Sequence, residues 1–344
     1  MKILVTGNLG YIGSVLTKVF TSEGINFVGY DTGYFENCLL DKVRNDFYQI
    51  KKDLRDINNN DLFNIDTIVH LSALSNDPLG EFNSRITREI NFDATIKLAK
   101  LAKTNGIERF IYISSQSMYG IADINSELDE YKSKKNPVTE YAKTKWDAEV
   151  ELNKLSDKNF SVTSLRPSTV YGVSPRLRCD IVFNNLLACA YTTGKIEIKS
   201  DGSPWRPVVH IRDVCSAILA VLRAPIELVE GKAFNIGIKD GNYTVKQIAE
   251  VVNNAVKGSV LKFTNEHLND PRTYKVSFNR ILTELKDYYK PVWSLEKGAV
   301  ELLDFFKKIN FNENQFRGFL TNRLQSLSKS IKDNKIDNNF RIKI

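Results

Sequence analysis

Tyr141 and Lys145 lie four positions apart, a spacing that places both side chains on one face of a helix. A tyrosine acts as a base near neutral pH only if its pKa falls by about three units from its ordinary value near 10. A neighbouring lysine ammonium favours this shift because it stabilises the phenolate. The pair therefore predicts acid–base chemistry at a substrate hydroxyl.

The spacing alone is not specific, because the sequence holds three further pairs of this kind: Tyr48/Lys52, Tyr131/Lys135 and Tyr191/Lys195. The first lies in an expected strand, where a spacing of four separates the side chains. The second lies in a polar stretch before Pro137, and the third spans Gly194. Only Tyr141 opens a clear helical segment, so we assign the chemistry to Tyr141 and Lys145.

Hydroxyl side chains follow the apolar segment 110–113. Ser114 and Ser115 would lie at the carboxyl edge of a parallel sheet, where such folds bind ligands. We expect Ser115 to hydrogen-bond the hydroxyl group that Tyr141 deprotonates. The alternative is that the two serines only cap the end of the strand.

A glycine pattern follows the first apolar segment: Gly7, Gly10 and Gly13 form G-x-x-G-x-x-G, with Tyr11 and Ile12 inside it. Glycines let the backbone turn tightly and let a pyrophosphate approach the peptide N–H groups at a helix N-terminus. The expected strand, loop and helix surround the pattern. It predicts a dinucleotide site.

Asp31 ends the second apolar segment, 18 residues after Gly13. A carboxylate at this point accepts hydrogen bonds from the adenosine ribose and repels a 2′-phosphate, which favours NAD over NADP. The alternative is a turn residue before Thr32 and Gly33. With NAD in place, the carbon hydrogen of the deprotonated alcohol would pass to the cofactor as hydride.

Short apolar segments alternate with amphipathic helical segments over the first 165 residues. The apolar segments are 2–6, 26–31, 47–51, 67–71, 109–114 and 161–166. This alternation predicts an α/β fold with a Rossmann-type doubly wound parallel sheet. The strand ends would bring the glycine pattern, Ser115 and Tyr141 to one edge.

The chain divides into interleaved regions. We expect an NAD-binding domain over residues 1–172 with returning segments at about 208–240, because 232–236 resembles a further strand. A smaller C-terminal substrate-binding region would use residues 173–207 and 241–312, where turn residues become frequent. Residues 313–344 form a basic tail with helical apolar spacing. This tail would dock on its own body or on another subunit, or serve a separate binding function.

Composition excludes several functions. The 344 residues are 42% hydrophobic and 26% charged, as in ordinary globular proteins. The net charge of +7 is spread along the chain with no nucleic-acid motif, so we expect a polyanionic small molecule as partner and no nucleic acid. No apolar run is long enough to cross a membrane, which predicts a cytoplasmic protein. The four cysteines and three histidines show no metal-site spacing.

Together these segments resemble extended short-chain dehydrogenase/reductases of the NAD-dependent epimerase/dehydratase family, which act mainly on nucleotide sugars. The resemblance covers about residues 1–305. The matching segments are 7–13, 53–56, 70–73, 91–95, 114–120, 141–145, 165–172 and 206–214.

The resemblance implies roles for further residues. Those that would contact the cofactor are Asp53, Leu54, Leu71, Ala73, Ser75, Asn91 and Pro167, together with Tyr141 and Lys145. Tyr141 would be the acid/base and Lys145 its helper. Arg206 would clamp the nucleotide diphosphate of the substrate because a guanidinium donates bidentately to phosphate, and Arg272 is a second candidate. A homodimer is also expected from the family.

Departures from the family pattern affect the substrate side. Thr169 stands where many members have an asparagine that contacts the substrate diphosphate. Ser115 is followed by Gln116 and Ser117, where 4,6-dehydratases carry Asp-Glu to drive loss of water. The resemblance therefore favours epimerisation through a 4-keto intermediate, with Ser115, Gln116 and Thr169 contacting the substrate.

Residues 174–178, Ser-Pro-Arg-Leu-Arg, resemble a motif in members that modify sugars for bacterial surface polysaccharides, including nucleotide-heptose 4-dehydrogenases and 4-epimerases. Arg176 and Arg178 would contact substrate or be ordinary surface charges. A nucleotide-sugar 4-dehydrogenase or reductase is therefore the alternative to the epimerase. A non-catalytic NAD-binding regulator is a third, and it would predict a broken Tyr–Lys pair.

Overall fold

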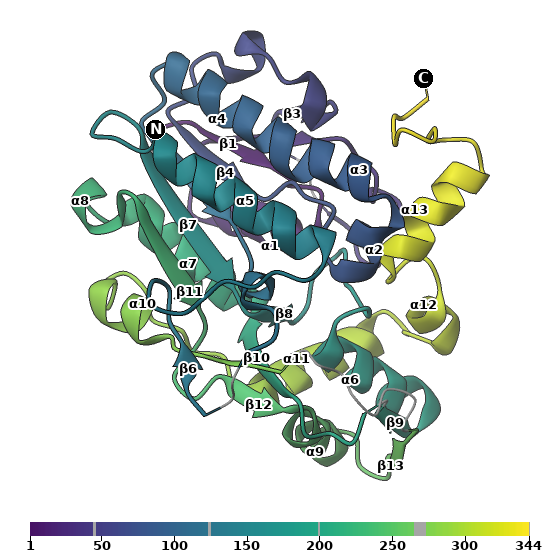
Figure 1. The fold of residues 1–344 in the computed structure, drawn as a ribbon. Coiled ribbons are helices and arrows are strands. Elements are labelled where there is room, and N and C mark those ends of the chain that lie inside the picture. Colours follow the sequence, from purple (N-terminus) through teal and green to yellow (C-terminus); the bar gives the residue numbers. More distant parts are fainter. Residues whose placement is uncertain (44–45, 123–124, 199, 265–272, 344) are drawn as a thin grey trace.

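The computed structural model describes residues 1–43, 46–122, 125–198, 200–264 and 273–343. At its centre, within these residues, lies a seven-stranded sheet (Figure 1). The strands, in spatial order, are β11 (Lys232–Ile236), β7 (Ser161–Pro167), β5 (Arg109–Ile113), β4 (Thr67–His70), β1 (Ile3–Thr6), β2 (Phe27–Asp31) and β3 (Gln49–Lys51). Each neighbouring pair is parallel.

The predicted α/β fold with a doubly wound parallel sheet is confirmed. Each of the six expected apolar segments contains a strand, and the segment at 232–236 is β11, which pairs with β7. Every residue of β1 and β4 is buried, as expected for strands covered on both faces.

Helices cover both faces of the sheet. The helices α1 (Tyr11–Ser22) and α7 (Ile211–Arg223) pack together on one face, while α4 (Ala94–Thr104) and α5 (Glu140–Leu155) pack together on the other (Figure 1). Their inward side chains fall into two separate apolar clusters, one on each side of the sheet. Helical crossovers between parallel strands bring the strand ends and their loops to one edge.

A smaller mixed region lies beyond that edge. Its strands are β6 (Glu127–Leu128), β8 (Thr169–Tyr171), β9 (Lys195–Ile198), β10 (Trp205–His210), β12 (Asn242–Thr244), β13 (Val260–Phe263) and β14 (Lys275–Val276). Its helices are α6 (Val182–Thr193), α9 (Val245–Ala255), α10 (Asn279–Glu284) and α11 (Leu295–Lys308), and α8 (Ile226–Val229) leads back to β11. The chain leaves the central sheet after β7 and returns as β11, so the two regions are interleaved.

Short helices complete the loops around the sheet edge. These are η1 (Leu54–Asp56), η2 (Asn59–Leu62), α2 (Asp77–Phe82), α3 (Ser84–Arg88), the π-helical turn η3 (Glu89–Asp93) and η4 (Gln116–Tyr119). Asn76 caps α2 and Asn83 caps α3, because each side chain accepts a hydrogen bond from a backbone N–H of the first turn.

The described part of the C-terminal tail, residues 313–343, carries α12 (Glu313–Arg317) and α13 (Arg323–Lys332), and α13 lies against α2 (Figure 1). Leu327, Ile336 and Phe340 join Leu79 and Ile86 in one buried cluster. Burying a side chain of this size contributes about 1.5–3 kcal/mol. The tail therefore docks on its own chain through a small apolar core.

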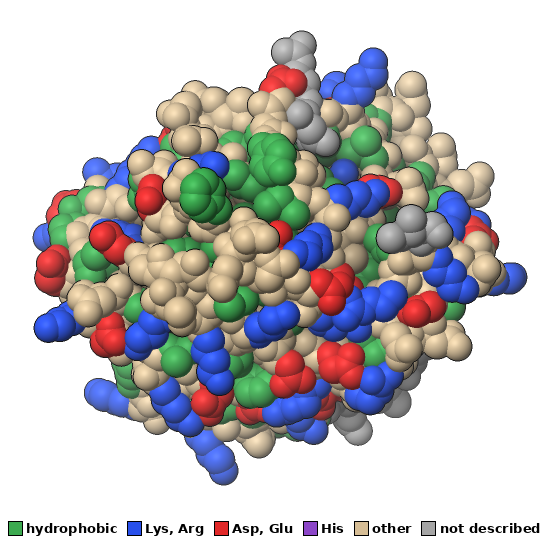
Figure 2. All heavy atoms as spheres, turned by 90° about the horizontal axis from the view of Figure 1, so that it is seen from above, with side chains coloured by type: hydrophobic (Ala, Val, Ile, Leu, Met, Phe, Trp, Pro, Cys, Tyr) green, Lys and Arg blue, Asp and Glu red, His purple; other side chains and the backbone are tan. Residues whose placement is uncertain are grey.

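Lys and Arg side chains are spread among Asp and Glu side chains over the face shown in Figure 2. On this face the positive charge does not form one continuous patch. None of the helices in the described part of the chain combines the length and the apolar character that crossing a bilayer requires.

Candidate active site

A cavity of about 430 Å³ lies at the carboxyl edge of the central sheet, where α/β folds bind ligands. Most of the residues singled out from the sequence line it: Gly7, Gly10, Tyr11, Ile12, Gly13, Asp31, Leu54, Leu71, Ala73, Ser75, Ser115, Gln116, Tyr141, Lys145, Pro167, Thr169, Arg178 and Arg206. The fold thus brings the glycine loop and the Tyr–Lys pair to one site.

The glycine loop is too tight for side chains at two positions. A Cβ on Gly7, whose φ is +75°, would lie 2.7 Å from the Ser72 nitrogen, and a Cβ on Gly13 would overlap the Gly7 carbonyl oxygen. At Gly10, by contrast, the nearest atom to a Cβ is that same oxygen, at 3.1 Å. Lack of space for a side chain therefore explains why glycine stands at Gly7 and Gly13, but it explains the glycine at Gly10 less well.

Gly10 stands directly before α1 and offers the helix no side-chain cap, and the first turn carries no acidic residue. The first N–H groups of a helix carry partial positive charge and attract anions. Gly10, Tyr11, Ile12 and Gly13 all line the cavity. The loop therefore fits the pyrophosphate of a dinucleotide.

Gly13→Ala is expected to weaken NAD binding by at least about tenfold, because the added Cβ must displace the loop that faces the pyrophosphate. Isothermal titration of the apoprotein with NAD measures this. Ser22→Ala, at the exposed far end of α1, is the control and should bind as the unmodified protein does. Unchanged affinity in Gly13→Ala would contradict the role of the loop.

Both oxygens of the Asp31 carboxylate accept backbone hydrogen bonds. One accepts from the Leu9 nitrogen at 3.0 Å and the other from the Gly33 nitrogen at 2.7 Å. The bond from Gly33 is the turn contact that was the alternative interpretation of Asp31. The bond from Leu9 also holds the glycine loop in place. Burial raises the pKa of this carboxyl, although both backbone hydrogen bonds lower it. Asp31 also lines the cavity, where the ribose contact stays a prediction.

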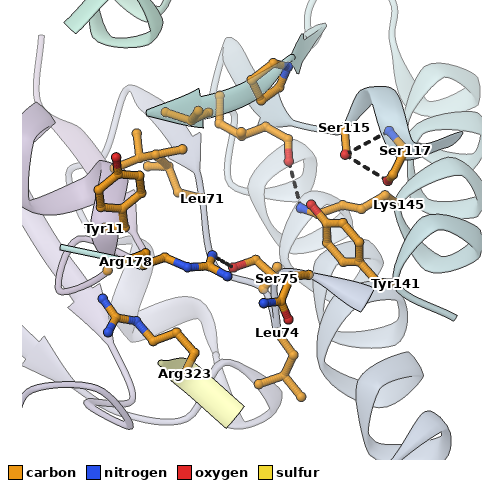
Figure 3. Close-up of a pocket in the computed structure, with 18 of the residues that line it drawn as sticks. Tyr11, Leu71, Leu74, Ser75, Ser115, Ser117, Tyr141, Lys145, Arg178 and Arg323 are labelled. Carbon is orange, nitrogen blue, oxygen red and sulfur yellow. Dashed lines mark hydrogen bonds between the residues drawn. The ribbon is translucent and has the colours of Figure 1, made fainter. Parts of the chain in front are cut away.

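Tyr141 and Lys145 lie one turn apart at the start of α5, where Thr139 caps the helix by accepting from the Ala142 nitrogen. Ser115 follows β5, and its Oγ accepts from the Ser117 backbone nitrogen at 3.1 Å (Figure 3). Ser115 therefore caps η4 and also lines the cavity. Ser115 thus caps a helix, as the alternative interpretation expected, and at the same time faces the site.

Burial raises the pKa of Tyr141, while its interaction with the Ser115 hydroxyl and the charge of Arg178 lower it and the charge of Asp77 raises it. A tyrosine buried in this way needs added positive charge nearby before it can give up its proton. Ser115 and Arg178 are the groups of this site that act in that direction.

Lys145 is 3% exposed, and its ammonium donates to the Ile113 carbonyl oxygen at 2.7 Å (Figure 3). Burial lowers the pKa of Lys145 to about 7, although Glu149 acts in the opposite direction. A lysine with such a pKa exchanges its proton readily near neutral pH. Lys145 is thus suited to pass a proton.

Three of the residues singled out from the sequence lie in the described part of the chain but do not line the cavity. Asp53 caps η1 and pairs with Arg55 at 2.7 Å. The Asn91 amide accepts from the Leu74 nitrogen at 2.8 Å and donates to the Leu74 oxygen at 3.1 Å, so it holds the loop after β4. Arg272 lies outside the described residues.

The third is Arg176, for which the surface-charge interpretation is wrong, while a contact with substrate stays a prediction. It is 4% exposed, so it is not a surface charge, and it does not reach the cavity. Its Nε donates to the Leu9 carbonyl oxygen at 2.5 Å. Arg176 therefore stabilises the glycine loop without lining the cavity.

Arg178 does line the cavity. It pairs with Asp180 at 2.8 Å and donates to the Ser75 hydroxyl at 2.9 Å (Figure 3). Arg206, from β10, lines the cavity and donates to the Trp205 carbonyl oxygen at 2.9 Å.

The Gln116 side chain is buried in the cavity wall. Its amide nitrogen donates to the Arg166 carbonyl oxygen at 3.0 Å, while its Oε1 has no hydrogen-bond partner in the described structure. Leaving a buried amide oxygen unpaired costs about 1–3 kcal/mol. This oxygen is suited to accept a hydrogen bond from a bound ligand.

Several residues that line the cavity were not identified from the sequence, among them Tyr34, Asp77, Asp180 and Arg323. Tyr34 follows Gly33, so its nearness to Asp31 could have indicated it. Arg323 belongs to the tail, where nothing in the local sequence separates it from the other basic residues.

Comparison with known proteins gives consistent matches. UDP-glucose 4-epimerase of Mycolicibacterium smegmatis is 27% identical over 324 residues, covering 89% of this chain and 99% of that protein. UDP-glucuronic acid decarboxylase 1 of Arabidopsis thaliana is 25% identical over 328 residues, covering 92% and 72%. The solved structure of MoeE5 in complex with UDP-glucose and NAD has a TM-score of 0.75 and 25% identity, covering 90% and 99%.

A family model described as the NAD dependent epimerase/dehydratase family matches residues 3–237. The match begins with β1 and ends one residue after β11, so it spans the whole seven-stranded sheet and the Tyr–Lys pair. It confirms the resemblance that the sequence motifs indicated. The chain belongs to the NAD-dependent epimerase/dehydratase family.

Proposed function

We propose that this enzyme is an NAD-dependent nucleotide-sugar epimerase that acts through a 4-keto intermediate. The observation that carries the proposal is the joint placement of Tyr141, Ser115 and Gln116 in one cavity wall beside Lys145. The wall offers an acid/base and hydroxyl-binding groups, which are what oxidation and reduction of a sugar alcohol require.

The chain's own residues would move the proton. Tyr141 accepts the proton of the C4 hydroxyl, while Ser115 holds the same oxygen. Lys145 stabilises the phenolate and passes the proton onward, as its pKa of about 7 allows. NAD bound at the glycine loop supplies the hydride acceptor at C4 and the donor for reduction. Epimerisation follows when the sugar presents its other face before Tyr141 returns the proton.

The state of the acidic residues favours epimerisation over loss of water. Within the described residues, the carboxylates that line the cavity belong to Asp31, Asp77 and Asp180. Asp31 accepts two backbone hydrogen bonds, Asp77 accepts from Thr139 at 2.6 Å, and Asp180 pairs with Arg178. By the family resemblance, Gln116 and Ser117 stand where dehydratases carry their acids, so the described residues of this wall include no free acid for expelling water.

The substrate we propose is a nucleoside diphosphate sugar. UDP-glucose is named for the epimerase relative and for the MoeE5 complex. Arg206 and Thr169 line the same cavity and would contact the diphosphate. The resemblance of residues 174–178 supports a role in surface polysaccharide biosynthesis, and a cytoplasmic homodimer stays an expectation from the sequence.

A 4-dehydrogenase or reductase is the second candidate. The same resemblance of residues 174–178 favours it, and its first step uses the same Tyr141 and Lys145. The two functions differ in the fate of the 4-keto sugar, which an epimerase reduces again and a dehydrogenase releases.

A panel of UDP-, GDP-, dTDP- and CDP-hexoses and heptoses, incubated without added acceptor, tests the proposal by chromatography with mass spectrometry. We expect a new peak of unchanged mass. Loss of two hydrogens with NADH formed would indicate the 4-dehydrogenase, and loss of water would contradict the argument from Gln116 and Ser117. Uronic acid substrates belong in the panel, because loss of carbon dioxide would indicate the activity named for the Arabidopsis relative.

A further inference from the structure

The C-terminal tail forms part of the cavity wall. Arg323, the first residue of α13, lines the cavity beside Arg178 and is 2% exposed. In Figure 3 both arginines lie on the side of Tyr11, across the cavity from Tyr141 and Lys145. The family match ends at residue 237, so Arg323 is supplied by a segment outside it.

The two arginines that line this wall differ in their ion pairing. Arg178 pairs with Asp180, but no carboxylate in the described part of the chain lies within ion-pairing distance of the Arg323 guanidinium. The Arg323 guanidinium donates to the carbonyl oxygens of Leu320 and Arg176, and the Arg323 backbone nitrogen donates to the Asp180 carboxylate at 3.4 Å. A buried cation without an anionic partner is costly, so this wall is built to receive an anion.

The position of the arginines indicates which anion. Arg176 donates to the Leu9 carbonyl oxygen of the glycine loop, and Ser174 donates to the Tyr11 carbonyl oxygen at 2.9 Å. The segment that carries Arg176 and Arg178 is therefore bound to the start of α1. Arg323 is tied to that segment by its bond to the Arg176 carbonyl oxygen, at 2.5 Å. The Arg323 guanidinium is thus linked through Arg176 to the loop that fits a pyrophosphate.

The end of the tail also contacts residues at and beside the cavity, around Tyr34 and Asp53. The Phe340 carbonyl oxygen accepts from the Tyr34 hydroxyl and from Arg55 at 3.1 Å. Arg341 pairs with Asp53 at 3.3 Å. Tyr34 lines the cavity, and Asp53 flanks Leu54, which lines it too. The tail therefore contacts the cofactor site at two separate places.

We propose that Arg323, supplied by the C-terminal tail, binds the pyrophosphate of NAD together with Arg178, so that docking of residues 313–344 completes the cofactor site. Guanidinium groups donate charge-assisted hydrogen bonds to phosphate oxygens. The tail then slows release of NAD, because these added hydrogen bonds must break before the cofactor leaves.

Binding of ligand fragments to the apoprotein tests the proposal without any turnover. Arg323→Ala should weaken ADP-ribose, which carries the pyrophosphate, by about 10- to 100-fold. Adenosine, which lacks it, should bind with unchanged affinity. The matched control is Arg317→Ala, an exposed tail arginine that pairs with Glu313 and does not line the cavity. It should bind both ligands as the unmodified protein does.

A second variant separates binding from folding. Arg323→Gln keeps a donor for the Leu320 and Arg176 carbonyl oxygens but removes the charge. We expect its ligand-free melting temperature to match the unmodified protein and its affinity for ADP-ribose to fall. It should also lose NAD faster during gel filtration.

Two outcomes would overturn the proposal. One is ADP-ribose affinity that is unchanged in both Arg323 variants. The other is a loss of affinity for UDP with none for ADP-ribose, which would assign Arg323 to the diphosphate of a nucleotide sugar. Neither outcome depends on which sugar the enzyme converts.

Discussion

Tyr141→Phe is expected to lower kcat by about 10²–10⁴-fold, the range typical of a lost acid/base group. Phenylalanine keeps the ring and its packing at the start of α5 but removes the hydroxyl that exchanges the proton. NAD binding should change little, because the glycine loop is untouched. Steady-state turnover of the nucleotide sugar identified in the panel, with NAD titrated separately, measures both effects.

The chain provides a matched control for this variant. Tyr48 and Lys52 have the same spacing as Tyr141 and Lys145, but Tyr48 is 71% exposed and does not line the cavity. Tyr48→Phe should keep full activity. Full activity in Tyr141→Phe would disprove the mechanism proposed here, whichever sugar is the substrate.

Lys145→Met is expected to have opposite effects on activity and stability. Turnover should fall by at least about tenfold, because Tyr141 loses the neighbour that stabilises its phenolate and passes its proton. The free energy of unfolding of the ligand-free protein should rise at pH 7. The reason is that burial lowers the pKa of Lys145 from its ordinary 10.5 to about 7.

The sign of the stability effect follows from proton binding. Above pH 10.5 Lys145 is neutral in both the folded and the unfolded chain, so burial carries no charge penalty. As the pH falls toward 7, the unfolded chain takes up a proton that the folded chain does not hold, and folding loses up to about 4 kcal/mol. Methionine removes this loss, and the difference should shrink again toward pH 10.5.

Urea unfolding at pH 7 and near pH 10 measures the effect. Lys143→Met is the control, since Lys143 is exposed on the same helix and no comparable gain is expected. A Lys145→Met variant that is less stable at both pH values would show that the hydrogen bond to the Ile113 carbonyl oxygen outweighs the cost of burying the amine.

The strands and the cofactor loop could be predicted because their signals are local. Buried parallel strands read as short apolar segments, and the loop needs glycine at Gly7 and Gly13 for the protein's own packing. The Tyr–Lys pair also stands four positions apart on one helix. In such features the interacting residues are close in sequence, so their spacing predicts the contact.

Contacts between distant segments could not be predicted in this way. Arg176 and Arg178 are two positions apart in one motif. Arg176 donates to the backbone of the glycine loop and does not line the cavity, whereas Arg178 lines it. Arg323 meets Arg176 across 147 positions of sequence. Asn91 belongs to a family motif, but both ends of its amide group hydrogen-bond the Leu74 backbone. Only the folded loop shows this pairing.

The return of the chain to the central sheet has a consequence for synthesis on the ribosome. β11 pairs with β7, but residues 168–231 must be made between them. At a translation rate of about 5–20 residues per second, the outer edge of β7 stays without its neighbour for roughly 3–13 s. An open strand edge can pair with other chains, so nascent copies on one messenger RNA are exposed to mispairing during this interval. Binding of a chaperone to the emerging β7 would protect the enzyme at that stage.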